Sequence, residues 1–400
     1  MDVSARTSPP PHGPRSGEVL GELSHELFAS LRRRDQRQRG EQYVRGLLTA
    51  RGRKSVRNIA AAVGHPEAEQ NLHHFIADST WDWQPIRAAL ALQLEQMAPS
   101  MAWVVEPLPI PKAGQHSVGV GRRLHPQLGH MFRGQEAFGL WFATPHMSMP
   151  VNWRLFLPDT WVRDPERRDR ASVPDEIRPE TRDECAAAVV LEAVRQWQLP
   201  PRPVVIDGRG AGLQAVVQRF AAAQVPVLVR VTPSALFSVA DAALPGYGAG
   251  ALPAQRILQS VQGLRRPVQY ADPDPVPVAR SVLAAAVPVE LPAQHGGRAR
   301  PLRPLRLLGE WHDPQRPPAR LWLTDAHRVP VPTLLRMTKL PRRVAADLAV
   351  AGEASGLRDY AGRSFDGWHR HITLASVAHS VAVLAALGYE EPFSAPELSA

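Results

Sequence analysis

The chain has 400 residues, of which 44% are hydrophobic, and its 47 Lys and Arg outnumber its 38 Asp and Glu, for a formal net charge of +9. This length and composition are typical of a globular protein of two or three domains, and no apolar run reaches the about 20 residues of a membrane span. The single cysteine, Cys185, excludes an internal disulfide and a cysteine-built zinc site. We therefore expect a cytoplasmic protein without a membrane partner.

The excess of positive charge predicts a polyanionic partner, most simply double-stranded DNA, because basic side chains that neutralise phosphates release counterions. Only Lys54, Lys112 and Lys339 are lysines, and every other cation is arginine. Coding bias in a GC-rich genome explains the arginine preference as well as a functional demand does. The sign of the charge still favours nucleic acid.

The first part of the chain divides into a leader and a helical region. Residues 1–17 are rich in Pro, Ser and Gly, which predicts a disordered leader. Apolar residues at helical spacing in "LGELSHELFASLRRR" and "IRAALALQLEQM" predict helices within residues 18–98.

Within the helical region, the spacing predicts a helix over Val56–Val63 that stops at Gly64, and a second helix opened by Pro66. A helix, a turn with glycine and a further helix have the form of a helix-turn-helix, although an ordinary helical hairpin has the same pattern. If this segment contacts DNA, Lys54 and Arg57 are the candidate contacts.

Residues 99–235 predict a ribonuclease-H-like α/β domain with a mixed sheet. Three strands are expected first, then a helix, a strand, a helix and a strand. The expected strands are "MAWVVEPLPIP", "EAFGLWFATP", "MPVNWRLFLP", "PVVIDG" and "VPVLVRV". Open sheets of this class place their chemistry at the carboxyl ends of strands, where we expect Glu106 and Asp207.

The sequence after residue 235 indicates three further segments: an inserted subdomain, a group of helices and a tail. Residues 236–330 are Pro-rich and strand-like, and they are too many for a loop inside a compact fold, which predicts an inserted β subdomain. Residues 331–390 predict helices that complete the ribonuclease-H-like domain, and residues 391–400 form a tail.

Several separated motifs resemble those of bacterial insertion-sequence DDE transposases, in the family's order and over about residues 40–385. They are "PKAGQHSVGVGRR", "RLFLPDTW", "VVIDGRGAG", "LWLTD" and "GLRDYAGRSFDGWHRHITLASVAHS". The segment "RKSVRNIAAAVGHPEAEQNLHHFIADSTWDW" resembles the family's N-terminal DNA-binding and dimerisation region. The resemblance implies a protein of the bacterial nucleoid that binds element ends and target DNA, cuts and transfers strands, and works as a monomer or a homodimer.

The resemblance also implies a metal site. Family members use two Mg²⁺ ions, about 3.5 to 4 Å apart, held by two Asp and one Glu. Matched by position, the first acid is Glu106 and the second is Asp207, but the third is Ala345. The Lys that follows on the same helix in the family is here Gly352. The chain therefore resembles a transposase with a degenerate catalytic triad.

No neighbouring acid replaces the missing one on an ideal helix. Asp347 points about 200° away from Ala345, and Glu353 lies about 12 Å further along the axis. We therefore expect impaired strand cleavage with weakened Mg²⁺ binding. Two alternatives are a non-enzymatic DNA-binding protein, such as a regulator derived from a transposase, and a nuclease with a rearranged carboxylate set.

Further basic residues are candidate DNA contacts. Lys112, Arg122 and Arg123 follow the first strand and are expected beside Glu106 near a bound phosphate. By analogy with the family, Arg363 and Arg370 near the last helix are also candidates.

His369 and His371 flank Arg370 and suggest a metal site at first sight. Two residues apart on a helix, they point about 200° away from each other and cannot share one ion. A structural role for both histidines is the simpler interpretation.

Overall fold

The computed structural model describes residues 14–64, 68–125, 129–209, 212–272, 278–292 and 303–388. Within these ranges the helices are α1 (Pro14–Leu27), α2 (Arg34–Thr49), α3 (Val56–Ala62), α4 (Ala68–Ala77), α5 (Gln84–Met97), α6 (Asp159–Val162), α7 (Pro165–Ala171), α8 (Arg182–Gln196), α9 (Leu213–Ala222), α10 (Ala254–Ser260), α11 (Val331–Met337), α12 (Leu340–Asp347) and α13 (Phe365–Ala386). A π-helical turn, η2 (Leu348–Gly352), continues α12. No helix in these ranges has the length and apolar character needed to span a bilayer.

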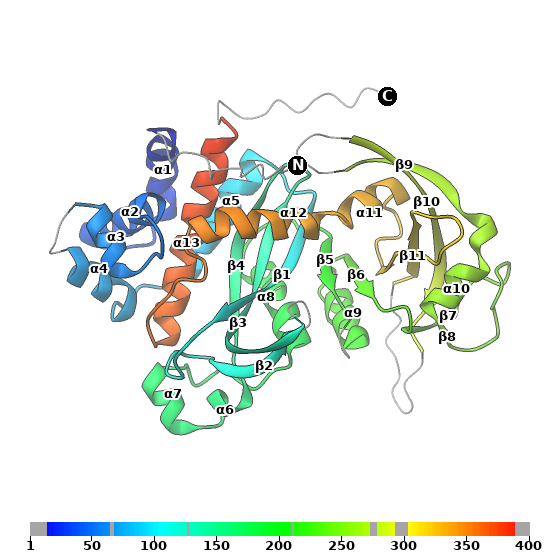
Figure 1. The fold of residues 1–400 in the computed structure, drawn as a ribbon, viewed down its shortest axis with the longest axis horizontal. Coiled ribbons are helices and arrows are strands. Elements are labelled where there is room, and N and C mark those ends of the chain that lie inside the picture. Colours follow the sequence, from blue (N-terminus) through cyan, green and yellow to red (C-terminus); the bar gives the residue numbers. More distant parts are fainter. Residues whose placement is uncertain are drawn as a thin grey trace, which may run out of the picture.

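The strands form one mixed sheet. They are β1 (Ala102–Pro111), β2 (Gly121–His125), β3 (His130–Ala143), β4 (Ser148–Phe156), β5 (Val204–Asp207), β6 (Val227–Val231), β7 (Leu236–Val239), β8 (Leu252–Pro253), β9 (Arg266–Asp272), β10 (Val278–Glu290), β11 (Leu305–Trp311) and β12 (Arg320–Thr324). The main order is β2-β3-β1-β5-β6-β12-β11-β10-β7-β8, with β4 paired to β3 and β9 paired to β10 (Figure 1).

The centre of the sheet contains the elements predicted for residues 99–235, and together they form a mixed α/β fold. β1, β3 and β4 form an antiparallel meander, and β5 and β6 then add in parallel beside β1. The helices α8 and α9 make the two crossovers between these strands, as parallel neighbours require. One strand was not expected: β2 contains Arg122 and Arg123, two of the candidate DNA contacts.

The strands of residues 236–330 continue the same sheet. β12 pairs antiparallel with β6, and β11, β10 and β7 follow outward from it. The segment expected to be an inserted subdomain is therefore joined to the central sheet by backbone hydrogen bonds, and it lengthens the sheet on one side (Figure 1).

Helices cover both faces of the central sheet. Asn152 and Trp153 are successive residues of β4 and point to opposite faces. The Asn152 amide donates to the carbonyl of Val189 on α8, and the Trp153 indole donates to the hydroxyl of Ser376 on α13. Hence α8 and α13 lie on opposite faces. α12 lies on the face of α13, because Asp347 and His379 both bond to residue 148 of β4.

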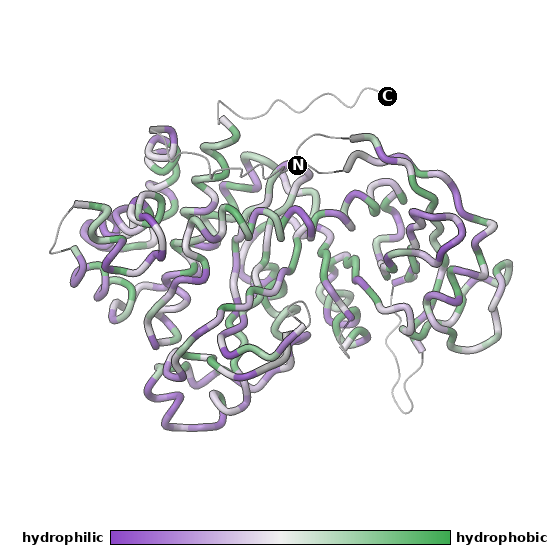
Figure 2. Tube along the Cα trace, viewed as in Figure 1, coloured by the Kyte–Doolittle hydropathy of each residue, from purple (hydrophilic) through white to green (hydrophobic). Residues whose placement is uncertain are grey.

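The helix α13 is the centre of the N-terminal half. It is buried along most of its 22 residues and packs against α1, α2, α4 and α5 on one side and against β4 on the other. The apolar residues of these helices and of the sheet form one continuous core. Hydrophobic residues run through these central elements, whereas α7, with its run of charged side chains, is a hydrophilic segment at the lower edge (Figure 2).

A buried arginine ties three of these elements together. Arg87 of α5 is 1% exposed. It donates to Thr373 (2.7 Å) and to the carbonyl of His369 (3.3 Å) on α13, and to the side chain of Asn152 and the carbonyl of Trp153 on β4 (both 2.9 Å). Burial lowers its pKa to about 9, so Arg87 stays charged at neutral pH.

The expected boundaries at the two ends meet the structure only in part. α1 begins at Pro14, three residues before the end of the expected leader at Gly17, and residues 1–13 lie outside the described residues. The tail of residues 391–400 also lies outside them. The predicted helix pair is present as α3 and α4, and Gly64 between them has φ of 85°, a conformation that favours glycine.

Candidate active site

Glu106 and Asp207 lie on neighbouring parallel strands. Trp103 pairs with Val204 and Val104 with Val205, so continuing this register by two residues places Glu106 beside Asp207. Asp207 is the last residue of β5, as expected of a site residue. Glu106 differs from expectation, because β1 continues through it to Pro111 and it therefore lies in the middle of its strand.

A row of charged side chains shares the face of these two acids. Asp207 pairs with Arg230 on β6, and Arg230 pairs with Trp322 on β12. Residues paired across strands point to the same face, and Arg320, two residues before Trp322, does so too. Burial, and then the charges of Arg342 and Arg230, lower the pKa of Arg320. Basic groups therefore accumulate next to Asp207.

Asp207 is already held by a cation. Arg209 donates its Nε–H to Oδ1 of Asp207 (2.8 Å) and its Nη2–H to Oδ2 (2.5 Å), and its backbone N–H also reaches Oδ1 (3.2 Å). Such a bidentate pair is the strong form of an arginine–carboxylate contact. Both oxygens of Asp207 are engaged, although the side chain is 35% exposed.

The helix α12 crosses this face, and contacts at both of its ends fix its position (Figure 1). At its start, the ammonium group of Lys339 donates to the carboxylate of Glu310 on β11, an ion pair that is almost fully buried. At its end, the carboxylate of Asp347 accepts from the backbone N–H (2.9 Å) and the hydroxyl (2.7 Å) of Ser148 on β4. Between these anchors α12 packs over β1.

The residues of α12 that face outward contain no acid. Ala345 and Ala346 are exposed between the two anchors. Asp347 is buried and bound to Ser148 and to Arg343, so it holds the helix to the sheet and cannot serve the site. At Gly352, an added Cβ would lie 2.9 Å from Leu348. A side chain at that position therefore requires the end of Leu348 to shift.

One protein family matches the part of the chain that contains both acids. The family model described as DDE superfamily endonuclease matches residues 26–274, which is more than half of the chain. The chain belongs to this family of DDE superfamily endonucleases. The match includes Glu106 and Asp207 and ends before α12.

No curated protein matches the sequence. Among solved structures, the chain is similar to a piggyBac transposase in the cryo-EM structure of its synaptic complex with hairpin DNA, with 10% sequence identity and a TM-score of 0.38, over 94% of this chain and 75% of that chain.

Endonucleases of the DDE superfamily use divalent metal ions, which favour carboxylate oxygens. In this DDE superfamily member the residues present do not fit such ions. Glu106 and Asp207 are two acids where three are needed, and Arg209 occupies the oxygens of the second. Among the residues that the structure describes, no three His, Cys, Asp or Glu side chains are placed to hold one ion.

Three of the candidate DNA contacts of this DDE superfamily endonuclease are exposed. Arg57 lies on α3, Arg122 on β2, and Arg363 just before α13. The side chain of Arg123 lies outside the described part of the structure. α4, the second helix of the predicted helix-turn-helix, contains no Lys or Arg.

Two candidate contacts are buried, which corrects the expectation for them. Lys54 is 5% exposed and its ammonium group donates to the carbonyl of Ala50. Arg370 is 3% exposed and donates to the carbonyls of Trp81 (3.1 Å) and Ile76 (3.2 Å). It therefore satisfies one carbonyl in the last turn of α4 and one in the segment that follows, as a basic residue at a helix C-terminus often does, and is not available to DNA.

Lys112 is placed differently from expectation. It was expected beside Glu106, but it follows the end of β1, six residues and so about 20 Å further along the strand. Its ammonium group donates to the carbonyl of Tyr360 (2.5 Å), at the entrance of a pocket described below.

The histidines beside Arg370 have structural partners. Nδ1 of His369 accepts from Arg87 (3.1 Å), and the ring stacks on Trp83 at 4.7 Å between centroids. Nε2 of His371 lies 2.9 Å from the carbonyl of Gly356, which can only accept, so this nitrogen carries the proton. Nδ1 of His371 then accepts from the hydroxyl of Tyr43 (2.8 Å).

Because His371 is buried, we expect the free energy of unfolding to depend on pH. Burial lowers its pKa to about 4, below the usual 6.5, so the unfolded chain binds the proton more tightly. The stabilisation is complete above about pH 6.5 and is lost as the pH falls towards 4, a loss on the order of 3 kcal/mol. Urea unfolding at about pH 7 and about pH 4.5 measures it, with His371→Gln as the comparison. The same pH dependence in both proteins would contradict the assignment.

Arg209, Arg230 and Arg342 were not among the residues expected at the site. Arg209 could have been expected there, because it lies only two residues after Asp207. Arg230 and Arg342 could not have been, because only the pairing of β6 with β5 and the position of α12 bring them near Asp207.

Proposed function

We propose that this protein is a transposase-type DNA-binding protein that engages the double-stranded ends of a bacterial insertion sequence and whose strand-cleavage site is impaired. The observation that carries the proposal is the state of Asp207, whose two oxygens both accept hydrogen bonds from Arg209. With Ala345 on the outward side of α12, the site lacks the third acid that two-metal chemistry needs.

The charges near Asp207 support binding in place of cleavage. Burial, and after it the positive charges of neighbouring arginines, lower the pKa of Arg230 and of Arg320, and the charge of Arg342 acts on both. A face of this kind attracts the phosphates of DNA without providing the ligands that a metal ion requires. The basic face therefore favours a protein that binds DNA without cutting it, as a regulator does, whether as a monomer or a homodimer.

Binding to duplex DNA should weaken steeply with salt. If Arg57, Arg122 and Arg363 each neutralise one phosphate, raising the salt from about 50 to about 200 mM lowers the affinity roughly 40-fold. Fluorescence anisotropy with a labelled duplex measures this. The affinity of the triple variant Arg57→Ala, Arg122→Ala, Arg363→Ala should depend less steeply on salt. Arg316 is an exposed side chain on the loop before β12, and Arg316→Ala should leave the salt dependence unchanged.

The same protein should not nick a labelled duplex in the presence of Mg²⁺ or Mn²⁺. Nicking that disappears in Asp207→Ala would refute the impaired site, and salt-insensitive or absent binding would refute the DNA-binding function.

A further inference from the structure

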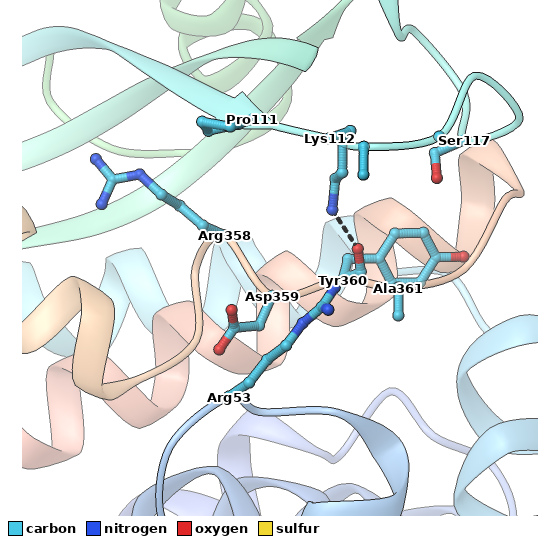
Figure 3. A pocket seen from close by; sticks show the side chains of 10 residues that line it. Arg53, Pro111, Lys112, Ser117, Arg358, Asp359, Tyr360 and Ala361 are labelled. Carbon is cyan, nitrogen blue, oxygen red and sulfur yellow. Dashed lines mark hydrogen bonds between the residues drawn. The ribbon is translucent and has the colours of Figure 1, made fainter. Parts of the chain in front are cut away.

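A pocket lies between the N-terminal helices and the end of β1, away from Glu106 and Asp207. Its volume is about 410 Å³. Three distant segments line it: Arg53 from the loop between α2 and α3, Lys112 after β1, and residues 358–361 before α13 (Figure 3). The pocket therefore exists only when the helical region is packed against the sheet.

The pocket has more positive than negative charge. Arg53, Lys112 and Arg358 line it against a single acid, Asp359. The carboxylate of Asp359 accepts from the backbone N–H of Lys54 (2.7 Å), which fixes it to the wall. Figure 3 shows the Arg53 guanidinium and the Lys112 ammonium group extending into the same space from opposite sides.

Much of the hydrogen-bonding capacity of these cations remains unused. Lys112 has three N–H donors, and the bond to the carbonyl of Tyr360 uses one. For the guanidinium of Arg53, no hydrogen bond or ion pair is formed with another described residue. Arg358 donates to the carbonyl of Pro109 (3.2 Å) and to Glu353 (3.1 Å), and so borders the pocket with part of its donors engaged.

The electrostatics of Lys112 favour the binding of an anion in this pocket. Burial, and after it the nearby charge of Arg53, lowers the pKa of Lys112 to about 8. Two cations that face each other in a partly dry pocket repel, and an anion between them would remove that cost. A tetrahedral oxyanion accepts from both an ammonium group and a guanidinium, which is the donor set offered here.

We propose that this pocket binds one phosphate group of a nucleic-acid backbone, with Arg53 and Lys112 as its donors and Ser117 and Tyr360 at its margin. The inference rests on the proposed DNA-binding function and assigns a position to one of its phosphate contacts. Arg53 of the pocket wall lies three residues before α3, the first helix of the predicted helix-turn-helix, so a duplex bound at that helix would bring its backbone close to the pocket. Free phosphate shares the same chemistry and serves as a probe.

The three lysines of this chain make a direct test practical. In protein labelled with ¹³C at lysine Cε, Lys54, Lys112 and Lys339 give three titrating signals, and the signal missing from Lys112→Arg identifies Lys112. Saturating inorganic phosphate, or a short duplex, is expected to raise the pKa of Lys112 by about one unit or more. The signals of Lys54 and Lys339 should not move, and chloride at equal ionic strength should have no such effect.

Arg53→Ala is the matched variant, because the Arg53 side chain is exposed and its removal leaves the fold intact. It is expected to weaken phosphate binding about tenfold. Duplex that binds without moving the Lys112 signal would overturn the pocket assignment and leave the proposed function standing. Phosphate that moves the signal while no duplex binds would support the pocket and refute the function. No response to either ligand would refute both.

Discussion

Replacing Arg87 with alanine is expected to lower the free energy of unfolding by about 3 to 5 kcal/mol. The side chain makes hydrogen bonds to α13 and β4 from inside the core. Removing it leaves the carbonyls of Trp153 and His369 and the amide oxygen of Asn152 without this donor. Each buried polar group left unsatisfied costs about 1 to 3 kcal/mol.

The measurement is urea unfolding followed by fluorescence of the buried tryptophans. Arg45→Ala is the matched control, since Arg45 is a half-exposed arginine of α2 paired with Glu41 and should change the stability by about 0.5 kcal/mol or less. A loss of similar size in both variants would show that Arg87 does not join the elements as described.

Restoring the acidic site should create metal binding. In the combined variant Glu106→Asp, Arg209→Ala, Ala345→Glu, Asp207 loses its cation and α12 gains an acid one turn beyond Arg342, whose charge acts on Arg230 beside Asp207. One positive charge is removed and one negative charge is added on the face that contains Asp207. The affinity for Mn²⁺ should rise about 100-fold or more, which corresponds to about 3 kcal/mol. Isothermal titration and electron paramagnetic resonance of Mn²⁺ both report it.

Two further variants test the role of each residue in that result. Arg209→Ala alone should raise the affinity less, because two acids remain where three are needed. Adding Asp207→Ala to the combined variant should abolish the gain. If the combined variant folds normally and still binds no Mn²⁺, the placement of α12 over Glu106 and Asp207 is wrong.

The sequence predicted the central elements well, because their apolar patterns are local. Continuous apolar runs specify β1 and β3, and the order of strands and helices leaves few ways to pair them. The parallel pairing of β1 with β5 brings Glu106 beside Asp207, and that pairing is implied by the α8 crossover.

What the sequence could not predict depends on contacts between distant segments. From the sequence, Arg370 is predicted to lie on the surface, because burying an arginine is costly unless hydrogen-bond acceptors surround it. The carbonyls that accept from Arg370 lie almost 300 residues earlier in the chain, so the sequence does not reveal them. Likewise, Arg53 and Lys112 meet only because the helical region packs against the end of β1. The pairing of β12 with β6 also joins segments that are far apart in the sequence. The strands of residues 236–330 were therefore predicted to form a separate subdomain.

The position of α13 in the chain determines when the packing of the N-terminal helices can be completed during synthesis. The helices α1, α2, α4 and α5 are made before the sheet, yet the helix that covers their apolar faces is made after all of them and after the whole sheet. Contacts of such long sequence separation form slowly, and the uncovered faces are open to other chains in the meantime. The packing of these helices is therefore completed only once α13 has been made.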